Sequence, residues 1–278
     1  MKNRTIIDKS NFISPFRVYL MRNEGGVRNW FKKGLISLTI FFSVLSTNAQ
    51  KVNVAAAANL RYVLEEIKTA YVKQNPKAKV NLTFGASGTL VQQITNGASF
   101  DFFMSADNEY PLKLKEKGLT VGPMSTYAYG KLALYSITLE VEKLGLKALT
   151  NPAVKKIALA NPEIATYGTR GLELMKSLKI YDALKGKIVI AENISQAAQY
   201  AFTGNTELGF IAYSYALAPD MAGKGHCYIV DPKMYSPIEQ ACILIKTQSL
   251  NTEAAKFKKF VLSPATKGIW EKYGYTAP

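Results

Sequence analysis

Short apolar segments alternate with segments of helical spacing along this chain, and this alternation limits its possible folds more than any other feature. Residues 51–58 and 79–84 read as short buried strands, and between them apolar residues recur on one helical face from Leu60 to Tyr71. Strands that alternate with helices predict a mostly parallel sheet with helices on both faces. The chain is therefore expected to be an α/β protein.

The same alternation continues to the C-terminus. Further strands are expected at residues 100–104, 131–137, 156–160, 187–191, 208–212, 226–231 and 241–246. Further helices are expected near residues 90–94, 109–117, 172–178, 194–203, 252–262 and 264–273.

The number of elements indicates two lobes. The roughly 230 residues after position 50 would be many for one sheet of this kind. No linker of low complexity separates two halves, so we expect the chain to cross between lobes more than once, near 127–130 and 232–237. The predicted lobes are residues 50–128 with 236–278, and residues 129–235.

The first 49 residues have the order of a secretory leader. A basic stretch (29–33) precedes an apolar stretch (34–45), and Ala49 marks a small-residue cleavage site. About a dozen apolar residues is short of the roughly 20 that a membrane-spanning helix needs, although an uncleaved anchor is the alternative. Met21 is an alternative start. No Cys lies near the predicted cleavage site, so a lipid-anchored N-terminus is not expected. We expect export to the periplasm.

The formal net charge of +15 narrows the choice of partner only partly. Residues 1–50 hold eight Lys/Arg and two Asp/Glu, which leaves the rest of the chain near +9. That charge favours either long-range attraction of anions or simple solubility. The positive residues are scattered and form no stripe interleaved with aromatics, so a nucleic-acid partner is not expected.

The chain has two cysteines, Cys227 and Cys242, and one histidine, His226. A disulfide in an oxidising compartment and two buried thiols are both open. A single histidine excludes most zinc sites, and it excludes a Ser-His-Asp triad unless His226 serves. No directly ligated metal and no cofactor are expected.

Four strand-to-helix junctions carry small or polar residues: 58–59, 85–88, 167–169 and 192–195. Free N–H groups and the positive end of the helix dipole make such junctions anion sites. Ordinary helix capping is the alternative at each one. Because two junctions fall in each predicted lobe, an anion held between the lobes would contact all four.

Several motifs in these regions carry a family resemblance. They are Val-Ala-Ala-Ala-Ala-Asn-Leu (54–60), Phe-Gly-Ala-Ser-Gly-Thr-Leu (84–90), Asn-Gly-Ala (96–98), Phe-Asp-Phe-Phe-Met-Ser-Ala-Asp (100–107), Asn-Pro-Glu (161–163), Tyr-Gly (167–168), Glu-Asn-Ile (192–194), Leu-Gly-Phe-Ile (208–211) and Tyr-Gly (273–274). The ordered set resembles the periplasmic molybdate-binding proteins of ABC importers. The resemblance implies a two-lobed type II periplasmic binding fold that captures molybdate or tungstate and delivers it to a membrane permease. We expect a monomer and no enzymatic activity.

The resemblance also implies a set of oxyanion-binding residues. Its members are Ala58, Asn59, Ser87, Tyr167 and Ile194. Ser87 matches the family's hydroxyl donor, and Asn59, Ser87, Tyr167 and Ile194 match positions whose backbone N–H groups bind the anion. The chain departs from the pattern at Ala212, where many members have a ligand-binding Tyr, and Tyr213 is not assumed to replace it. Tyr167 stands where many members have a small residue. Asn59, Tyr167 and Ala212 together resemble a subgroup of the family.

Such a site fits a fully deprotonated ion, because molybdate needs hydrogen-bond donors only. Phosphate keeps a proton and needs an acceptor, and sulfate must be rejected by size. Sulfate or a small organic acid remains the alternative ligand. An organic acid calls for an Arg clamp, but Arg61 and Arg170 are expected to face solvent.

An enzyme and a regulator's effector domain are the alternative classes of protein. An enzyme on this fold would need paired acids or a nucleophile with a base, which the junctions lack. Asp107 either faces the cleft or caps the next helix. A regulator's effector domain would need a DNA-binding segment, whereas the N-terminus reads as a leader.

Overall fold

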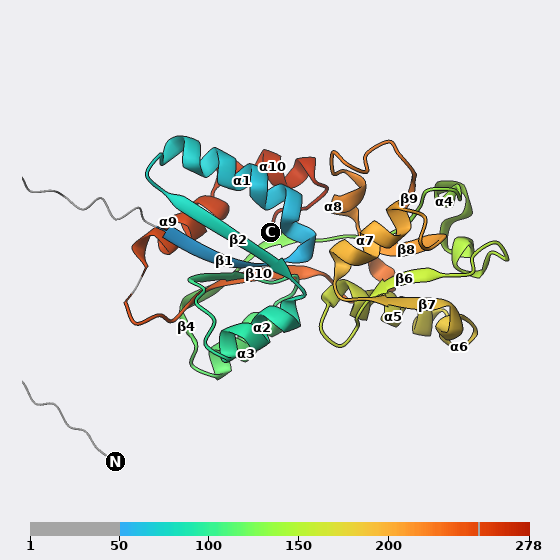
Figure 1. The fold of residues 1–278 in the computed structure, drawn as a ribbon, viewed down its shortest axis with the longest axis horizontal. Helices are drawn as coiled ribbons and strands as arrows, with labels where there is room; N and C mark the ends of the chain where they lie inside the picture. Colours follow the sequence, from blue (N-terminus) through green and yellow to red (C-terminus); the bar gives the residue numbers. More distant parts are fainter. Residues whose placement is uncertain (1–50, 250) are drawn as a thin grey trace, which may run out of the picture. The chain divides into compact units, whose positions relative to one another are not determined.

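The computed structural model describes residues 51–249 and 251–278, whose strands form two five-stranded sheets (Figure 1). The first sheet, of order β2-β1-β3-β10-β4, consists of β1 (Lys51–Ala57), β2 (Lys79–Gly85), β3 (Phe102–Met104), β4 (Thr120–Tyr129) and β10 (Glu239–Ile245). The second sheet, of order β7-β6-β8-β5-β9, consists of β5 (Leu132–Ser136), β6 (Ile157–Ala160), β7 (Ile188–Ala191), β8 (Leu208–Ala212) and β9 (His226–Ile229). The predicted leader, residues 1–49, lies outside the described residues.

Helices pack on both faces of each sheet, and Figure 1 shows α1 and α10 on the opposite face of the first sheet from α2 and α3. The helices of the first sheet are α1 (Arg61–Gln74), α2 (Ser87–Thr95), α3 (Glu109–Glu116), α9 (Thr252–Val261) and α10 (Lys267–Lys272). Those of the second are α4 (Val141–Leu144), α5 (Thr166–Ser177), α6 (Tyr181–Leu184), α7 (Ile194–Phe202) and α8 (Tyr213–Ala216). Short 3₁₀ helices are η1 (Ala58–Leu60), η2 (Gly145–Thr150), η3 (Lys185–Lys187), η4 (Pro232–Met234) and η5 (Pro264–Thr266).

Both sheets are mixed, whereas the sequence predicted mostly parallel ones. β1 runs parallel to β2 and β3, but β10 runs antiparallel to both β3 and β4. In the second sheet β6 runs parallel to β7 and β8, but β5 runs antiparallel to both β8 and β9. The reason is the crossing of the chain between sheets. β5 and β10 each enter their sheet directly from the other sheet, so they run against the strands that end at that shared edge.

The position of β1 is fixed by burial on both of its faces. Val54 and Ala56 belong to the larger hydrophobic cluster, together with apolar side chains of α1 and α9. Ala55 points the other way and joins Phe103 in a smaller cluster with side chains of α2 and α3. Period-two alternation with apolar residues on both faces is the pattern of a buried parallel strand. This packing fixes the end of β1, and with it the residues that follow, Ala58 and Asn59.

The two cysteines are free thiols in different sheets. Cys242 is buried in β10 and Cys227 is half-buried in β9. Of the two alternatives that the sequence left open, the structure therefore has the thiols. None of the helices within residues 51–249 and 251–278 is long and apolar enough to cross a membrane.

Candidate functional site

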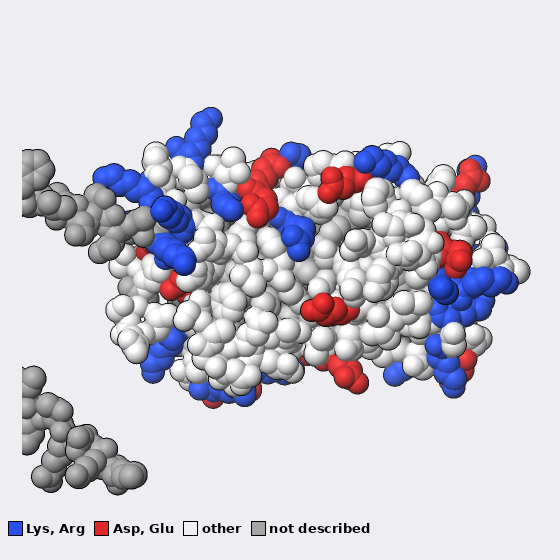
Figure 2. Space-filling view, in the orientation of Figure 1, with Lys and Arg blue, Asp and Glu red and all other residues white. Residues whose placement is uncertain are grey.

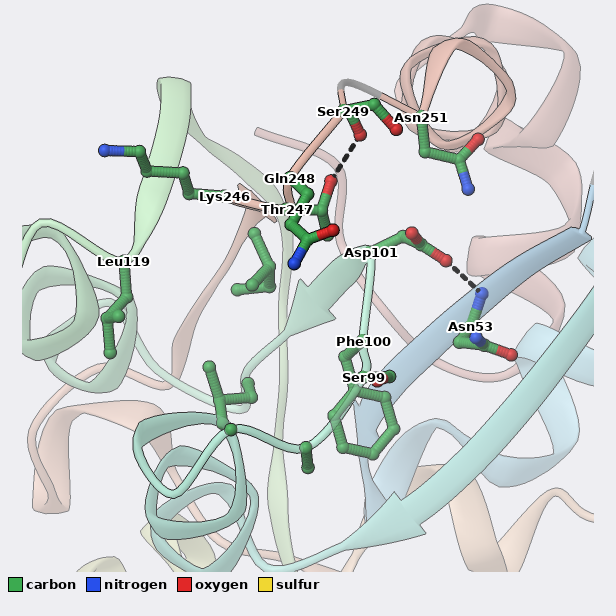
Figure 3. Close-up of a pocket in the computed structure, with 14 residues that line it drawn as sticks. Asn53, Ser99, Phe100, Asp101, Leu119, Lys246, Thr247, Gln248, Ser249 and Asn251 are labelled. Atoms are coloured by element: carbon green, nitrogen blue, oxygen red, sulfur yellow. Dashed lines mark hydrogen bonds between the residues drawn. The ribbon is translucent and has the colours of Figure 1, made fainter.

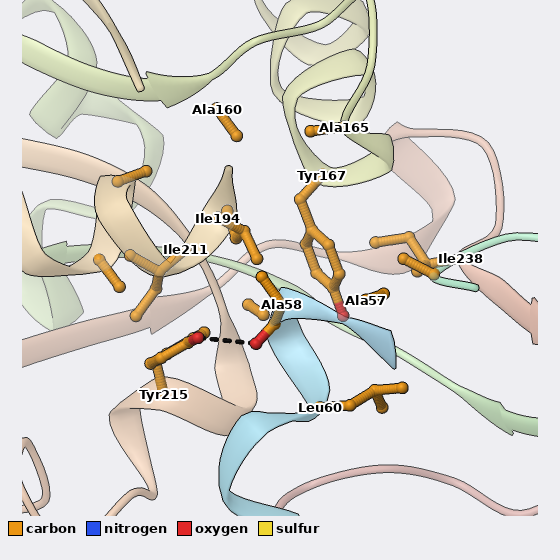
Figure 4. Packing of buried hydrophobic residues seen from close by; sticks show 14 of the residues in the cluster. Ala57, Ala58, Leu60, Ala160, Ala165, Tyr167, Ile194, Ile211, Tyr215 and Ile238 are labelled. Carbon is orange, nitrogen blue, oxygen red and sulfur yellow. Dashed lines mark hydrogen bonds between the residues drawn. The ribbon is translucent and has the colours of Figure 1, made fainter. Parts of the chain in front are cut away.

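A small pocket lies where the four junctions of the sequence analysis meet. It is lined by Ala57, Ala58, Asn59, Gly85, Ala86, Ser87, Ala106, Ala165, Thr166, Tyr167 and Ile194. All five residues that were expected to bind an oxyanion are in this set. Figure 4 shows Ala58, Tyr167 and Ile194 close together, each on a different element. The cavity volume is about 10 Å³, far below the roughly 300–1,000 Å³ of pockets for drug-sized ligands. The pocket therefore suits a ligand of a few atoms.

The lining contains no charged side chain. Its polar side chains are those of Asn59, Ser87, Thr166 and Tyr167. A buried anion here must be stabilised by neutral dipoles, because no Lys or Arg lines the pocket to neutralise it. Neutral N–H and O–H donors that are held in place by the fold can fill that role without a counter-ion.

Ser87 begins α2 and offers two donors. Its Oγ accepts the backbone N–H of Ala106 at 3.1 Å, which leaves the hydroxyl hydrogen free to donate. The backbone N–H of Ser87 belongs to the first turn of α2, where N–H groups have no acceptor within the helix. Both groups lie at the positive end of the helix dipole.

Ile194 is selected as a donor by the way in which α7 is capped. The Asn193 side chain accepts the N–H groups of Ser195 and Gln196 at 2.9 and 3.2 Å, and the Asn193 carbonyl accepts that of Ala197 at 3.1 Å. Among the described residues, this leaves the N–H of Ile194 as the donor in the first turn without a protein acceptor. Capping by Asn193 thus satisfies the other first-turn N–H groups of α7 but leaves the Ile194 N–H available to a ligand.

Tyr167 is the second residue of α5, so its backbone N–H is also in a first turn. The first helical bond nearby runs from the Thr169 N–H to the Ala165 carbonyl, at 3.0 Å. The Tyr167 side chain is 2% exposed, and burial raises its pKa well above the ordinary value. The phenol is therefore neutral and forms part of the pocket wall.

Asn59 is buried beside the pocket, but its amide hydrogens are used within the protein. Nδ2 donates to Gln240 Oε1 at 2.8 Å and to the Tyr275 hydroxyl at 2.9 Å. A fully deprotonated oxyanion needs only hydrogen-bond donors at such a position. In this arrangement, the group that Asn59 offers as a donor is its backbone N–H, and its Oδ1 has no protein partner among the described residues.

Hydroxyls hold the two carbonyls that follow β1. The Tyr215 hydroxyl donates to the Ala58 carbonyl at 2.7 Å, and Ser214 Oγ and the Tyr275 hydroxyl donate to the Asn59 carbonyl at 3.0 and 2.8 Å. Burial raises the pKa of both Tyr215 and Tyr275, so these phenols stay protonated and able to donate. Holding the Ala58 carbonyl in this way fixes the peptide plane that carries the Asn59 N–H, and the bonds to the Asn59 carbonyl hold the next peptide unit.

The departure at Ala212 is not compensated by its neighbour. Ala212 is fully buried at the end of β8 and carries no donor side chain. The ring of Tyr213 lies against Gly274, where a Cβ atom would meet Tyr213 Cδ1 at 2.5 Å. Tyr213 is not among the residues that line the pocket.

Direct hydrogen bonds join the two sheets around the pocket. Asp107 Oδ1 accepts the backbone N–H of Tyr110 at 3.0 Å, which caps α3, and Oδ2 accepts the hydroxyl of Thr166 from α5. The N–H of Gly88 donates to the carbonyl of Ile164 at 2.9 Å. A Cβ atom on Gly88 would lie 3.0 Å from Ile164 Cα, so only glycine permits this approach. Asp107 thus caps its helix, as expected, and also bonds across the cleft.

The two arginines near the junctions do not line the pocket. The Arg61 guanidinium lies over the ring of Phe84, 4.9 Å from its centroid. Arg170 pairs with Glu173 at 3.5 Å. Neither forms the clamp that a carboxylate ligand would call for. Figure 2 shows Lys and Arg interspersed with Asp and Glu on the visible face, with no basic stripe.

A larger hollow lies at the opposite edge of the first sheet, near Asn53, Asp101 and the end of β10 (Figure 3). Two pairs of its polar residues are hydrogen-bonded to each other. Asp101 accepts the N–H of Asn53 at 2.7 Å, and Thr247 donates to the carbonyl of Ser249 at 2.6 Å. No buried polar side-chain atom without a partner belongs to its lining in the described part of the chain. We therefore assign no ligand to this hollow.

Comparison with known proteins identifies the family. Residues 52–276 match the sequence profile of the bacterial extracellular solute-binding proteins. The chain belongs to this family. As an extracellular solute-binding protein it has the two-lobed α/β fold predicted from its sequence, of the type II periplasmic binding class.

Several similar proteins bear names that match the predicted resemblance. The molybdate-binding protein ModA of Rhodobacter capsulatus is 36% identical over 233 residues, covering 83% of this chain and 90% of that protein. ModA of Azotobacter vinelandii is 33% identical over 231 residues, covering 83% and 91%. The solved periplasmic molybdate-binding protein of Azotobacter vinelandii has a TM-score of 0.78 and 30% identity, covering 82% of this chain and 99% of that one. The resemblance is thereby confirmed.

Sequence reasoning missed polar residues that line this pocket or bond to the residues that line it. They are Thr166, Ser214, Tyr215, Gln240 and Tyr275. Gln240 carried one usable signal, because a Gln directly before a run of apolar strand residues is a buried polar group that must find partners. The others carried none, because helix starts and chain ends often contain hydroxyl side chains.

Proposed function

We propose that this protein is the solute-binding component of an ABC importer and that its ligand is molybdate or tungstate. The oxyanion is held by Ala58, Asn59, Ser87, Tyr167 and Ile194. The observation that carries the proposal is a pocket between two sheets, lined by donors and free of charged side chains. The relatives named for molybdate binding support the choice of ion.

The donor set fits a dianion that carries no proton. Such an ion accepts at every oxygen, so N–H and O–H groups satisfy it and acceptors repel it. The N–H groups of Ser87, Tyr167 and Ile194, with the Ser87 hydroxyl, supply donors from both sheets. Sulfate has the same charge and shape but shorter bonds, so a pocket sized for the metal oxyanion leaves sulfate with longer contacts.

The two sheets act as two lobes that close on the ion. We place the first lobe at residues 50–128 with 236–278, and the second at 129–235. The bonds from Gly88 to Ile164 and from Thr166 to Asp107 belong to the closed form, which the membrane permease recognises. The protein works as a monomer without a cofactor, and it catalyses no reaction. Residues 1–49 direct its export to the periplasm and are then removed.

Calorimetric titration of the protein starting at Gln50 tests this function. Molybdate, tungstate, sulfate, phosphate and small carboxylates are compared under the same conditions. We expect tight binding of the first two ions only. Each should also raise the midpoint of thermal unfolding, because ligand at 1,000 times Kd stabilises the native state by about 4 kcal/mol.

The alternatives give different results in the same experiment. Tight binding of sulfate or a carboxylate, with no heat from molybdate or tungstate, would overturn the choice of ligand. Product analysis after long incubation tests for catalysis. Chemical conversion of any bound compound would overturn the assignment as a binding protein.

A further inference from the structure

Residues 213–220, which contain α8, follow β8 of the second sheet but bond to residues of the first lobe. The Tyr215 hydroxyl donates to the Ala58 carbonyl, directly after β1, at 2.7 Å (Figure 4). Farther along, Asp220 accepts the hydroxyl of Tyr62 from α1 at 2.8 Å. We call this region the α8 contact; it consists of residues 213–220 on one side and Ala58, Asn59, Tyr62 and Gly274 on the other.

The α8 contact also includes apolar packing. The rings of Tyr62 and Tyr215 meet edge to face, with 5.6 Å between their centroids. Tyr213 and Leu217 lie so close to Gly274 that a Cβ atom there would meet their side chains at 2.5 and 3.0 Å. Parting these groups would expose apolar surface, and water does not replace the contacts that such surface loses. Opening the α8 contact is therefore unfavourable.

The α8 contact adjoins the place where the chain first crosses between the sheets. The backbone N–H of Tyr213 donates to the carbonyl of Lys131, directly after this crossing, at 2.9 Å. On the other side of Gly130, the backbones of Tyr129 and Thr276 exchange two hydrogen bonds, of 2.8 and 3.2 Å. When one lobe rotates about the segments that connect it to the other, groups beside those segments move least. The α8 contact is therefore placed to act as a pivot.

A second contact joins the sheets on the other face of the first sheet, and its printed bonds are between polar groups. We call it the α5 contact. The N–H of Gly88 donates to the carbonyl of Ile164 at 2.9 Å, and the Tyr110 hydroxyl donates to the carbonyl of Glu163 at 3.4 Å. Water can satisfy such N–H, O–H and C=O groups when they part, so the net cost of breaking these bonds is modest. The α5 contact consists of Gly88, Asp107 and Tyr110 on one side and residues 163–166 on the other.

We propose that the cleft opens on one side only: the α5 contact parts, while the α8 contact stays joined with and without ligand and serves as the pivot. The inference rests on the proposed function. It separates the moving part of the second lobe from its sequence range, because residues 213–220 stay with the first lobe. The ion then enters between α2 and α5, and it reaches Ala58 and Asn59 after their carbonyls are already held in place.

Two matched cross-links test which contact opens. Each replaces a tyrosine of the first lobe and an acidic residue of the second lobe by cysteine, and a short bifunctional thiol reagent then joins the pair in the ligand-free protein. Tyr62→Cys with Asp220→Cys locks the α8 contact, and Tyr110→Cys with Glu163→Cys locks the α5 contact. The unsubstituted protein, treated with the same reagent, is the control for the two native thiols.

The rate of molybdate association, measured by stopped flow before and after cross-linking, distinguishes the two contacts. We expect the lock on the α5 contact to slow association by more than about 10-fold, because the open form is no longer populated. The lock on the α8 contact should change the rate by less than about twofold, because a contact present in both forms does not shift their equilibrium.

The remaining outcomes separate the inference from the proposed function. Slowing by the lock on the α8 contact, or none by the lock on the α5 contact, would overturn the inference alone. Absence of molybdate and tungstate binding by the unmodified protein would overturn the proposed function. Thermal unfolding without ligand checks that each variant is folded.

Hydrogen exchange of the unmodified protein covers the case in which a variant does not fold. Peptides that contain residues 161–166 should exchange faster without molybdate than with it, because the α5 contact opens. Peptides that contain residues 213–220 should exchange at rates that differ by less than about twofold between the two conditions. A change in residues 213–220 as large as that in residues 161–166 would contradict a permanent α8 contact.

Discussion

The two sheets place their ligand-facing ends at equivalent positions but equip them differently. In each sheet the three parallel strands have one central member, β1 or β6, and an outer neighbour, β2 or β7. The candidate donors follow these four strands: Ala58 and Asn59 follow β1, Ser87 follows β2, Tyr167 follows β6 and Ile194 follows β7. Beside its backbone N–H groups, the first sheet offers the polar side chains of Ser87 and Asn59. The second sheet offers backbone N–H groups only, and the side chains of Tyr167 and Ile194 line the pocket.

This difference indicates a division of labour. A backbone N–H is a fixed donor, so the second sheet offers the same dipoles to any anion that fits. The side chains of Ser87 and Asn59 have polarity that depends on their neighbours, Ala106 and Gln240. We infer that the first sheet selects among ions and that the second closes over whichever ion is held. Substitutions in each sheet can separate these two roles.

Gly88→Val should have the largest effect, because it blocks closure. Its side chain would meet the backbone of Ile164, where even a Cβ atom would lie only 3.0 Å from Cα. We expect molybdate affinity to fall by more than about 100-fold, measured by titration, since the second-sheet donors no longer reach the ion. Gly268→Val is the matched control, because nothing lies within 4 Å of a Cβ there. An unchanged Kd would mean that the ion binds without closure.

Ile194→Pro should remove one donor while keeping the helix. Proline is favoured at the first position of a helix, and the extended backbone of Asn193 is compatible with a following proline. Loss of a hydrogen bond to a charged group, about 1.5–3 kcal/mol, predicts roughly 10- to 150-fold weaker binding. Molybdate, tungstate and sulfate should weaken by similar factors, and Ile194→Val should retain binding. A loss confined to one ion would break the assigned division of labour.

Ser87→Ala tests the first sheet in the same way. The hydroxyl donor is lost, and the N–H of Ala106 loses its acceptor at 3.1 Å. We expect weakening of roughly 10-fold or more, with a change in the ratio of molybdate to sulfate affinity, because this group is part of the selective set. Ser87→Thr keeps the hydroxyl and serves as the comparison. An unchanged ratio would place selectivity elsewhere.

Thr166→Val should have a smaller effect that is concentrated in the dissociation rate. It removes the hydrogen bond from α5 to Asp107 and leaves that buried carboxylate with its bonds from Ser105 and Tyr110. The closed form loses one contact that the open form does not make, so we expect roughly 3- to 10-fold faster release. Stopped-flow measurement checks this, and Thr166→Ser should restore the rate. A change only in the association rate would contradict a closing role.

A change of pH near neutrality should affect molybdate affinity less than any of these substitutions. Burial raises the pKa values of Tyr127, Tyr167, Tyr215 and Tyr275, so these groups keep their protons in the folded protein. Molybdate affinity should therefore be constant from about pH 7 to 9. Between about pH 7 and 9 these tyrosines should add no pH dependence to the free energy of unfolding, which should fall as pH rises past about 10, because the unfolded chain loses these protons first. Urea unfolding at several pH values tests this, and a rise in stability above pH 10 would contradict it.

Much of the fold could be predicted from sequence because buried strands leave a strong local pattern. β6 and β8 are continuous apolar runs, and β1 is apolar apart from Lys51 and Asn53; all three begin and end close to the expected residues. β4 was missed, because it lies at an edge and contains Gly122 and Pro123. Only its last part, near Tyr127 and Ala128, is buried. Such a strand is specified by its partner β10 rather than by its own sequence.

The candidate site was predictable where local rules apply and not where partners are distant. The first-turn N–H groups of α2, α5 and α7 follow from helix geometry alone. The partners of Asn59 are 181 and 216 residues away in sequence, so no local pattern could show that its amide is engaged. The polarity that this residue presents to a ligand is a property of the assembled fold.

The insertion of β10 between β3 and β4 has a consequence for the order in which a newly made chain acquires its structure. The second sheet is built from one uninterrupted stretch, residues 132–229, so all of its strands are present once that stretch has emerged. The first sheet lacks its fourth strand until residues 239–245 arrive, and Asn59 lacks its partner Tyr275 until residue 275 arrives. Residues 239–275 thus complete the first sheet and the hydrogen bonds of Asn59, whereas the strands of the second sheet need neither.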